Sequence, residues 1–284
     1  MKKLSIVVPA YNEETAIKIV LDDIRAVMDG TGISYEVIVV DDGSTDATSD
    51  RVRETDATLI TQEENRGYGA ALKRGIRQAE ADMVLTIDGD SSYPVTEIPN
   101  FLAAADACDM VVGARLGRWE RRETPRRMAR WLLNTLAGYL LETNIPDINS
   151  GMRLLKREVV MDYFHLLPSK FSFTTTLTLA MLSDRLRVHH VPIGYRKRLG
   201  KSKIRPLQDA FNFLVLIIRT VVYFNPLKVF LPISLLLCAL GLGVLAWRVI
   251  VHADIAQLEI LTLLLGVQVG LFGLLADIVV RRAK

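Results

Sequence analysis

Residues 35–46 read Tyr-Glu-Val-Ile-Val-Val-Asp-Asp-Gly-Ser-Thr-Asp. The largely apolar residues 35–40 predict a buried strand, and the polar residues from Asp41 onward predict the loop that follows it. Residues 4–9 have the same order, an apolar run that ends in a turn, and residues 13–28 read as the next helix. A strand, a loop and a helix in succession form the repeating unit of parallel α/β sheets.

This alternation continues along the chain. Three further strands are predicted at residues 57–61, 83–87 and 110–113, and two further helices at residues 69–79 and 95–105. The pattern predicts an α/β fold, a mostly parallel sheet with helices on both faces. In such sheets ligands bind beyond the carboxyl ends of the strands.

Polar residues cluster at those predicted strand ends. Residues 11–13 (Tyr-Asn-Glu) follow the first strand, residues 41–42 (Asp-Asp) the second and residues 88–90 (Asp-Gly-Asp) the fourth. Helix capping is the alternative explanation for any one cluster, and it is the role we expect for Asp46. For three clusters together we expect convergence on one cleft.

Asp88 and Asp90 form the single motif that most specifically indicates a function. Two carboxylates at positions i and i+2 of an extended segment point to the same side, and Gly89 between them would leave room for a ligand. Hard oxygen ligands of this kind suit Mg²⁺ or Mn²⁺ that bridges phosphates. The sequence therefore predicts a metal site at Asp88 and Asp90.

The apolar content is concentrated after about residue 211. Residues 229–247 carry no charge, and residues 260–280 carry only Asp277, near the end of the segment. Each segment is about one bilayer crossing long, which predicts two transmembrane helices. Two buried core helices of a soluble protein are the alternative. The basic residues that flank the pair predict that both termini are cytoplasmic; they are Lys228 on one side and Arg281, Arg282 and Lys284 on the other.

The segment before the hairpin has a different character. Residues 196–205 are strongly basic, and residues 207–224 are apolar with a few polar interruptions. A basic run beside such a segment predicts a helix that lies on an anionic membrane surface, against the alternative of a solvated charged face. The expected organisation is an α/β domain at 1–203, an interfacial region at 204–226 and a transmembrane anchor at 227–284.

Composition narrows the class of protein. A net charge of +3 is too small to indicate nucleic-acid binding. The two cysteines, Cys108 and Cys238, lie in segments of opposite character, so a disulfide framework is not expected and a reducing compartment fits. We expect the inner (cytoplasmic) membrane, with the catalytic domain in the cytoplasm.

Several motifs together resemble a known family. Residues 6–13, 40–46, 65–69 and 88–90 resemble the inverting glycosyltransferases of family 2, which have the GT-A fold. Residues 147–153, 171–176 and 195–203 are similar to the dolichyl-phosphate mannose synthase-like branch, which includes bacterial polyprenyl-phosphate glycosyltransferases with paired C-terminal transmembrane helices. The resemblance covers essentially the whole chain.

The resemblance implies a role for each matching position. The residues implied to hold the nucleotide-sugar are Pro9, Tyr11, Glu13, Asp41 and Asp88, with Asp88 and Asp90 also holding Mg²⁺ or Mn²⁺. The residues implied to bind the acceptor phosphate are Arg115, Arg127, Arg198 and Lys203. The catalytic set is Asp90, Arg115, Arg127 and Arg198. Two departures, Ser92 and Thr176 where relatives carry Gln and Glu, put the metal shell and the donor in doubt.

The implied reaction is transfer of a sugar from a GDP- or UDP-linked donor to polyprenyl phosphate, with inversion. An acceptor phosphate is already anionic at neutral pH, so the reaction needs positioning and charge neutralisation more than a strong base. His165, His189 and His190 lie in apolar surroundings without metal-ligand spacing, so they are expected to be structural. The alternatives are a tethered glycosyltransferase with another acceptor, a non-catalytic nucleotide-sugar-binding membrane protein, and a nucleotidyltransferase. A homo-oligomer is compatible with two membrane helices per chain.

Overall fold

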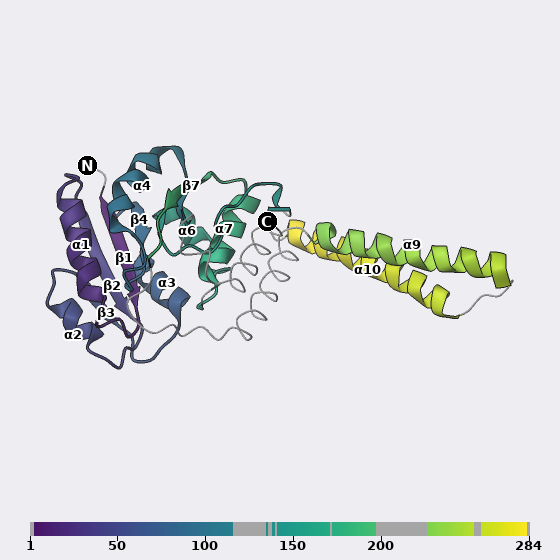
Figure 1. Ribbon diagram of the computed structural model, residues 1–284, viewed down its shortest axis with the longest axis horizontal. Coiled ribbons are helices and arrows are strands. Elements are labelled where there is room, and N and C mark those ends of the chain that lie inside the picture. The colour runs from purple at the N-terminus through teal and green to yellow at the C-terminus, as the bar shows by residue number, and fades with distance from the viewer. Residues whose placement is uncertain are drawn as a thin grey trace. The chain divides into compact units, whose positions relative to one another are not determined.

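The computed structural model describes residues 3–115, 135, 138, 139, 141–170, 172–196, 226–252 and 257–282. It contains two compact units, Met1–Phe211 and Asn212–Lys284. Figure 1 shows the strands and most helices in the first unit and a pair of long helices in the second. The helix predicted at residues 207–224 lies outside the described residues.

The first unit is built on a sheet whose described strands run in the order β3-β2-β1-β4-β6-β5-β7. The strands are β1 (Leu4–Ala10), β2 (Tyr35–Asp41), β3 (Thr58–Thr61), β4 (Met83–Thr86), β5 (Met110–Arg115), β6 (Arg153–Lys156) and β7 (Val188–Ile193). β1 is an inner strand that pairs in parallel with β2 and β4, so that Leu4 pairs with Tyr35 on one side and Met83 on the other. The predicted α/β fold, a mostly parallel sheet, is confirmed.

One strand breaks the parallel pattern. β6 lies between β4 and β5 and is antiparallel to both. Neither β6 nor β7 was predicted from the sequence. β6 has only four residues and pairs antiparallel with β4 and β5, so the repeating pattern of a parallel sheet gave no signal for it.

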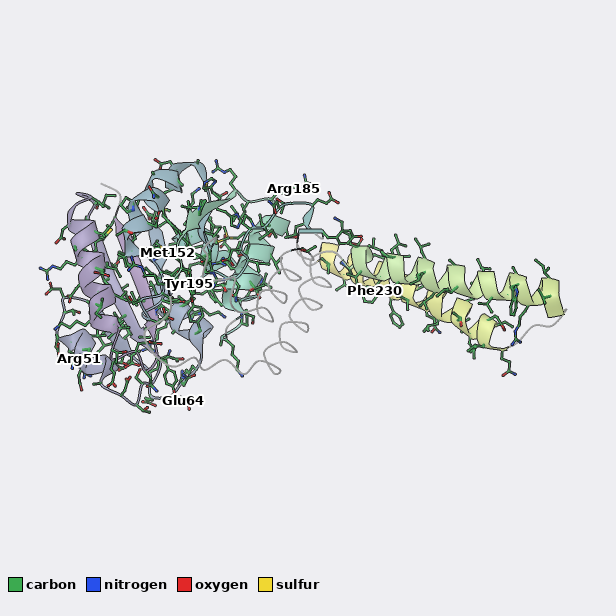
Figure 2. The ribbon with its side chains drawn as sticks, viewed as in Figure 1. Arg51, Glu64, Met152, Arg185, Tyr195 and Phe230 are labelled. Atoms are coloured by element: carbon green, nitrogen blue, oxygen red, sulfur yellow. The ribbon has the colours of Figure 1, made fainter. Side chains whose placement is uncertain are left out.

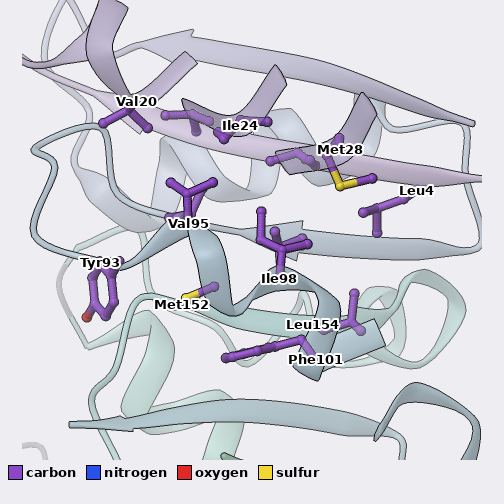
Figure 3. Packing of buried hydrophobic residues seen from close by; sticks show 14 of the residues in the cluster. Leu4, Val20, Ile24, Met28, Tyr93, Val95, Ile98, Phe101, Met152 and Leu154 are labelled. Carbon is purple, nitrogen blue, oxygen red and sulfur yellow. The ribbon is translucent and has the colours of Figure 1, made fainter. Parts of the chain in front are cut away.

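Helices cover both faces of the sheet. They are α1 (Ile17–Asp29), α2 (Thr48–Arg53), α3 (Tyr68–Gln78), α4 (Ile98–Ala104), α6 (Arg157–Asp162) and α7 (Phe173–Ser183), with short 3₁₀ turns at Val95–Glu97 and Ala105–Ala107. Alternate residues of β1 enter opposite cores: Ile6 and Val8 pack with α1 and α4, whereas Val7 packs with α3 and α7. Figure 3 shows the first of these cores, with Ile24 of α1 and Phe101 of α4 among its members. Burial on both faces explains why β1 reads as a continuous apolar run.

α3 approaches the sheet closely through Gly75. A Cβ at this position would lie 2.4 Å from Cγ1 of Val7 and 3.2 Å from Cγ2 of Val40. The first predicted helix begins later than expected, at Ile17 and not at residue 13. Residues 14–16 form a turn in which the backbone carbonyl of Glu13 accepts hydrogen bonds from the amides of Ala16 and Ile17.

The second unit is a hairpin of α9 (Leu227–His252) and α10 (Gln257–Arg282). Both helices are long and apolar enough to cross a membrane, over Leu227–Val251 and Gln257–Val280. They pack closely at Gly266, whose carbonyl accepts a 2.7 Å hydrogen bond from Ser234 and where a Cβ would lie 2.6 Å from Sγ of Cys238. An ion pair of 3.1 Å joins Arg248 to Glu259 near the loop.

Candidate active site

A cavity of about 510 Å³ lies at the carboxyl ends of β1, β2 and β4. Its lining includes Pro9, Tyr11 and Glu13 from the end of β1, Asp42 from the end of β2, and residues 88–90 after β4. The three polar clusters therefore converge on one cavity, because the carboxyl ends of parallel strands meet at one edge of the sheet.

At the end of β2 it is Asp42 that lines the cavity, whereas Asp41 does not. Asp42 accepts hydrogen bonds from the backbone amides of Arg66 (2.9 Å) and Gly67 (2.8 Å) and from Nε2 of Gln62 (3.0 Å). Burial raises the pKa of this carboxyl. Asp41 instead accepts hydrogen bonds from the backbone amide of Ser44 and the hydroxyl of Ser49. Asp41 is the last residue of β2 and Asp42 lies in the loop beyond it, and of the two only Asp42 lines the cavity.

Asp46 lies next to the N-terminus of α2 but is not its N-cap residue, which is Ala47. One of its oxygens accepts hydrogen bonds from the backbone amide (3.0 Å) and the hydroxyl (2.5 Å) of Thr48, the first residue of α2.

The loop at residues 65–69 joins two of the carboxylates. Gly67 has φ of +101°, and a Cβ there would lie 2.6 Å from the carbonyl oxygen of Ser169, so the position requires glycine. The next residue, Tyr68, begins α3, lines the cavity and donates a 2.8 Å hydrogen bond to Oδ1 of Asp88. Burial raises the pKa of Tyr68 well above its usual value, which keeps the hydroxyl protonated as a donor.

Asp88 and Asp90 both line the cavity, but not because they share one side of an extended segment. Gly89 and Asp90 lie in a turn and not in an extended segment, and Ser91 has φ of +60°. Gly89 does not simply leave room for a ligand, since a Cβ there would lie 2.9 Å from Cδ1 of Ile17. The turn, and not strand periodicity, brings the two carboxylates to one cavity.

Ser92 orients Asp90 through hydrogen bonds from outside the cavity lining. It is fully buried and donates hydrogen bonds to Oδ1 of Asp90 from its backbone amide (3.0 Å) and its hydroxyl (2.5 Å). It is not part of the cavity lining, and neither is Thr176, which lies on α7. The two departures from the family pattern therefore lie outside the cavity wall.

Arg115, at the end of β5, forms a buried ion pair beside the cavity. Its Nε and Nη2 donate to the two carboxylate oxygens of Asp147 at 2.6 and 2.9 Å. Its guanidinium also lies 5.3 Å from the ring centroid of Tyr195. Burial alone would lower the pKa of Arg115, but the neighbouring Tyr93 and the Asp147 carboxylate raise it well above its usual value. Arg115 therefore stays cationic.

The loop at residues 147–153 forms the wall next to Arg115. Arg153 is fully buried and donates to the backbone carbonyls of Ile148 (2.9 Å) and Ser150 (2.7 Å), which fixes the loop from beneath. Burial lowers the pKa of Arg153 to about 10, so the side chain remains charged at neutral pH. The loop places Asn149 and Gly151 in the cavity lining.

Two tyrosines complete this wall. The hydroxyl of Tyr93 accepts a 2.7 Å hydrogen bond from the backbone amide of Gly151, and its ring meets that of Tyr195 edge to face with centroids 5.3 Å apart. Tyr195 packs against the core that contains Met152, and both are labelled in Figure 2. No role was predicted for Tyr68, Tyr93, Asn149 or Tyr195, although three of them lie in motifs that resemble the family, at residues 65–69, 147–153 and 195–203.

Three predicted site residues, Arg127, Arg198 and Lys203, lie outside the described residues. Of the predicted structural histidines, His190 is half-buried on β7, and burial lowers its pKa to about 4, so it is neutral at pH 7. Within the described part of the chain, no group of three or more His, Cys, Asp or Glu side chains is arranged to hold a metal ion.

Comparison with known proteins agrees with this architecture. Residues 5–164 match the family model for glycosyl transferase family 2, and residues 225–281 match that for the GtrB C-terminal hairpin. A dolichyl-phosphate hexose transferase of Haloferax volcanii is 34% identical over 205 residues, which cover 72% of this chain and 87% of that protein. An undecaprenyl-phosphate 4-deoxy-4-formamido-L-arabinose transferase of Aeromonas hydrophila is 28% identical over 298 residues, which cover 99% and 89% of the two chains.

A solved structure is also similar. Glucosyl-3-phosphoglycerate synthase of Mycobacterium tuberculosis, in complex with Mn²⁺ and UDP-glucose, superposes with a TM-score of 0.59 at 26% identity, over 78% of each chain. The resemblance stated from the sequence motifs is confirmed.

Proposed function

The chain belongs to glycosyl transferase family 2, and from that premise we propose that it transfers a sugar from a nucleotide-sugar to polyprenyl phosphate with inversion. It is a glycosyltransferase, and two of its relatives are named as transferases that act on dolichyl phosphate and undecaprenyl phosphate. The observation that carries the proposal is the single cavity that brings Asp88 and Asp90 together with Arg115.

The donor nucleotide is assigned to the side of the cavity formed by the ends of β1 and β2. Pro9, Tyr11 and Glu13 keep the roles that the resemblance implied, and all three line the cavity. Asp42 is assigned in place of Asp41, because only Asp42 belongs to the lining. The nucleotide base, GDP or UDP, stays open.

Asp88 and Asp90 are assigned to the diphosphate through a divalent cation. Two carboxylates on one cavity wall are the hard oxygen donors that Mg²⁺ and Mn²⁺ prefer, and diphosphate oxygens and water would complete the shell. Such a cation, when bound, neutralises charge on the departing nucleoside diphosphate. Tyr68 and Ser92 hold the two carboxylates in place for this role.

The acceptor phosphate is assigned to Arg115 together with Arg127, Arg198 and Lys203, three residues that lie outside the described part of the chain. The bidentate contact with Asp147 uses Nε and Nη2 of Arg115 and leaves further guanidinium N–H groups for a phosphate. An anionic phosphate oxygen attacks C1 of the sugar from the face opposite the leaving diphosphate. The bond to the diphosphate breaks as the new C–O bond forms, which inverts the configuration.

The proposed location is the inner (cytoplasmic) membrane. The α9–α10 hairpin would anchor the chain, with the catalytic unit and both termini in the cytoplasm. The division into residues 1–203, 204–226 and 227–284, and assembly into homo-oligomers, belong to the same proposal.

The test is a lipid-extraction assay with the purified full-length protein. Labelled GDP- and UDP-sugars are offered one at a time with Mg²⁺ or Mn²⁺ and polyprenyl phosphate, and 3-phosphoglycerate replaces the lipid in a parallel arm. We expect label in the organic phase with one donor. Asp90→Asn should reduce transfer at least about 1,000-fold while membrane insertion is unchanged.

Two outcomes would contradict the proposal. Transfer only to 3-phosphoglycerate would assign a soluble acceptor. Full activity of Asp90→Asn would remove that carboxylate from the metal site.

A further inference from the structure

Asn149 contributes a neutral amide to the cavity wall and is held by two threonines. Its Oδ1 accepts a hydrogen bond from the hydroxyl of Thr174 at 2.6 Å and from that of Thr175 at 3.3 Å. Both threonines are almost fully buried in the first turn of α7. The side-chain oxygen of Asn149 is therefore directed toward α7.

This contact determines what the amide offers to a ligand. Oδ1 and Nδ2 lie on opposite branches of a planar group, so an oxygen that faces α7 turns the N–H donors away from α7. Asn149 lines the cavity, and among the described residues none accepts a hydrogen bond from Nδ2. The cavity is thus presented with donors and not with an acceptor.

The position of Asn149 indicates which part of the substrate it meets. Its backbone amide donates a 3.1 Å hydrogen bond to Asp147, which holds Arg115 on the acceptor side. Two residues further on, Gly151 packs against Asp88 on the donor side, where a Cβ would lie 2.6 Å from a carboxylate oxygen. Asn149 thus lies on the loop between Asp147, which holds Arg115 of the acceptor site, and Gly151, which packs against Asp88 of the donor site. The sugar is the group that is transferred between those two sites.

We propose that Asn149 is a specificity-determining residue whose amide donates a hydrogen bond to an oxygen of the transferred sugar. The inference rests on the proposed function and names the part of the substrate that this wall recognises. The sugar that fits carries a hydroxyl, carbonyl or carboxylate oxygen at this position. A sugar with a cationic amine there is disfavoured, because two donors would face each other. Thr174 is a positioning residue that acts through Asn149.

The decisive variant is Asn149→Asp, since aspartate keeps an oxygen for both threonines and replaces only the N–H donors. Asn149→Ala removes both, and Asn100→Ala, an exposed amide on α4, is the matched control. Each full-length variant is assayed for lipid-linked product with the donor that the wild-type protein uses, and kcat and KM are measured separately for donor and polyprenyl phosphate. Melting temperatures report on folding.

We expect Asn149→Ala to lower kcat/KM for the sugar donor about 10-fold, and Asn149→Asp about 100-fold, with KM for polyprenyl phosphate within about 2-fold of wild type. Asn149→Asp should also gain relative activity with amino-sugar donors. Thr174 itself lines the cavity, so the double variant separates a direct role from a positioning role: as a positioning residue, Thr174→Val should cost about 5-fold alone and nothing further in the Asn149→Ala background.

Three results would overturn the inference: wild-type kcat/KM in Asn149→Asp, a loss confined to KM for polyprenyl phosphate, or a Thr174→Val effect that is unchanged in the Asn149→Ala background. Each requires an active wild-type protein. If the wild-type protein transfers no sugar to the lipid, it is the proposed function that fails, so the two failures are distinguishable.

Discussion

Single residues orient the carboxylates of the cavity, and Tyr68 is the clearest case. Its hydroxyl contacts Oδ1 of Asp88 from the N-terminus of α3, while Gly151 packs against the same carboxylate. A hydrogen bond to a charged group contributes more than one between neutral groups, and burial keeps this hydroxyl protonated. Tyr68 is therefore a positioning residue for Asp88.

Tyr68→Phe should lower kcat/KM for the nucleotide-sugar about 10-fold while the ring keeps its packing in the core. Steady-state kinetics with varied donor measure the effect, and thermal melting reports on folding. Tyr35→Phe is the matched control, because Tyr35 also donates to a carboxylate, Asp29, but at an exposed position away from the cavity. Wild-type kinetics for Tyr68→Phe would show that Asp88 needs no such partner.

At the scale of elements, Asp109 connects β5, β6 and β7, in the part of the sheet where β6 runs antiparallel to its neighbours. It accepts a 2.6 Å hydrogen bond from Nζ of Lys156 at the end of β6 and a 3.0 Å hydrogen bond from the backbone amide of Arg187, just before β7. The Lys156 ammonium and the Arg187 amide lower the pKa of Asp109 to about 2. One carboxylate thus ties together the starts of β5 and β7 and the end of β6.

Asp109→Asn should lower the free energy of unfolding at pH 7 by about 1–2 kcal/mol. Because the folded pKa lies below the unfolded value, the stabilisation is present above about pH 4 and is lost as the pH falls toward 2. The difference in stability between wild type and variant should therefore shrink in that window, measured by denaturant unfolding at pH 7 and pH 2.5. Asp50→Asn, which breaks an exposed ion pair with Arg53, should change stability little at either pH. A difference that does not depend on pH would contradict the assignment.

At the scale of the whole molecule, the chain combines a family 2 catalytic unit with an apolar helical hairpin. The side chains that α9 and α10 do not bury against each other are large and apolar along most of both helices. Such a surface is disfavoured in water and suits a lipid environment. The chemistry in the cavity then takes place in a protein held at the membrane that supplies its proposed acceptor.

The proposed orientation predicts which positions a membrane-impermeant thiol reagent can reach from outside the cell. In a chain with Cys108 and Cys238 replaced by Ala, Gln257→Cys at the start of α10 should be labelled in intact cells. Glu64→Cys, an exposed position of the catalytic unit, should be labelled only after the membrane is permeabilised. The opposite pattern would reverse the topology inferred from the flanking basic residues.

Much of the fold could be predicted from the sequence because its signals are local. β1 and β2 are buried strands of the parallel part of the sheet, so they read as apolar runs that end in polar loops. The two long helices can be predicted from the length of their apolar segments and the scarcity of charged residues in them. The short strand β6 could not be predicted, because four residues carry little periodic signal and its antiparallel place between β4 and β5 depends on long-range pairing.

The candidate site divides in the same way. The sequence by itself determined that carboxylates follow β1, β2 and β4 and that such residues suit phosphates and divalent cations, since strand ends and side-chain chemistry are local properties. Only the tertiary structure decided that Asp42 and not Asp41 faces the cavity, that a turn brings Asp90 to Asp88, and that Asp147 holds Arg115. These facts depend on where side chains from distant segments meet, and packing of the complete chain sets that geometry.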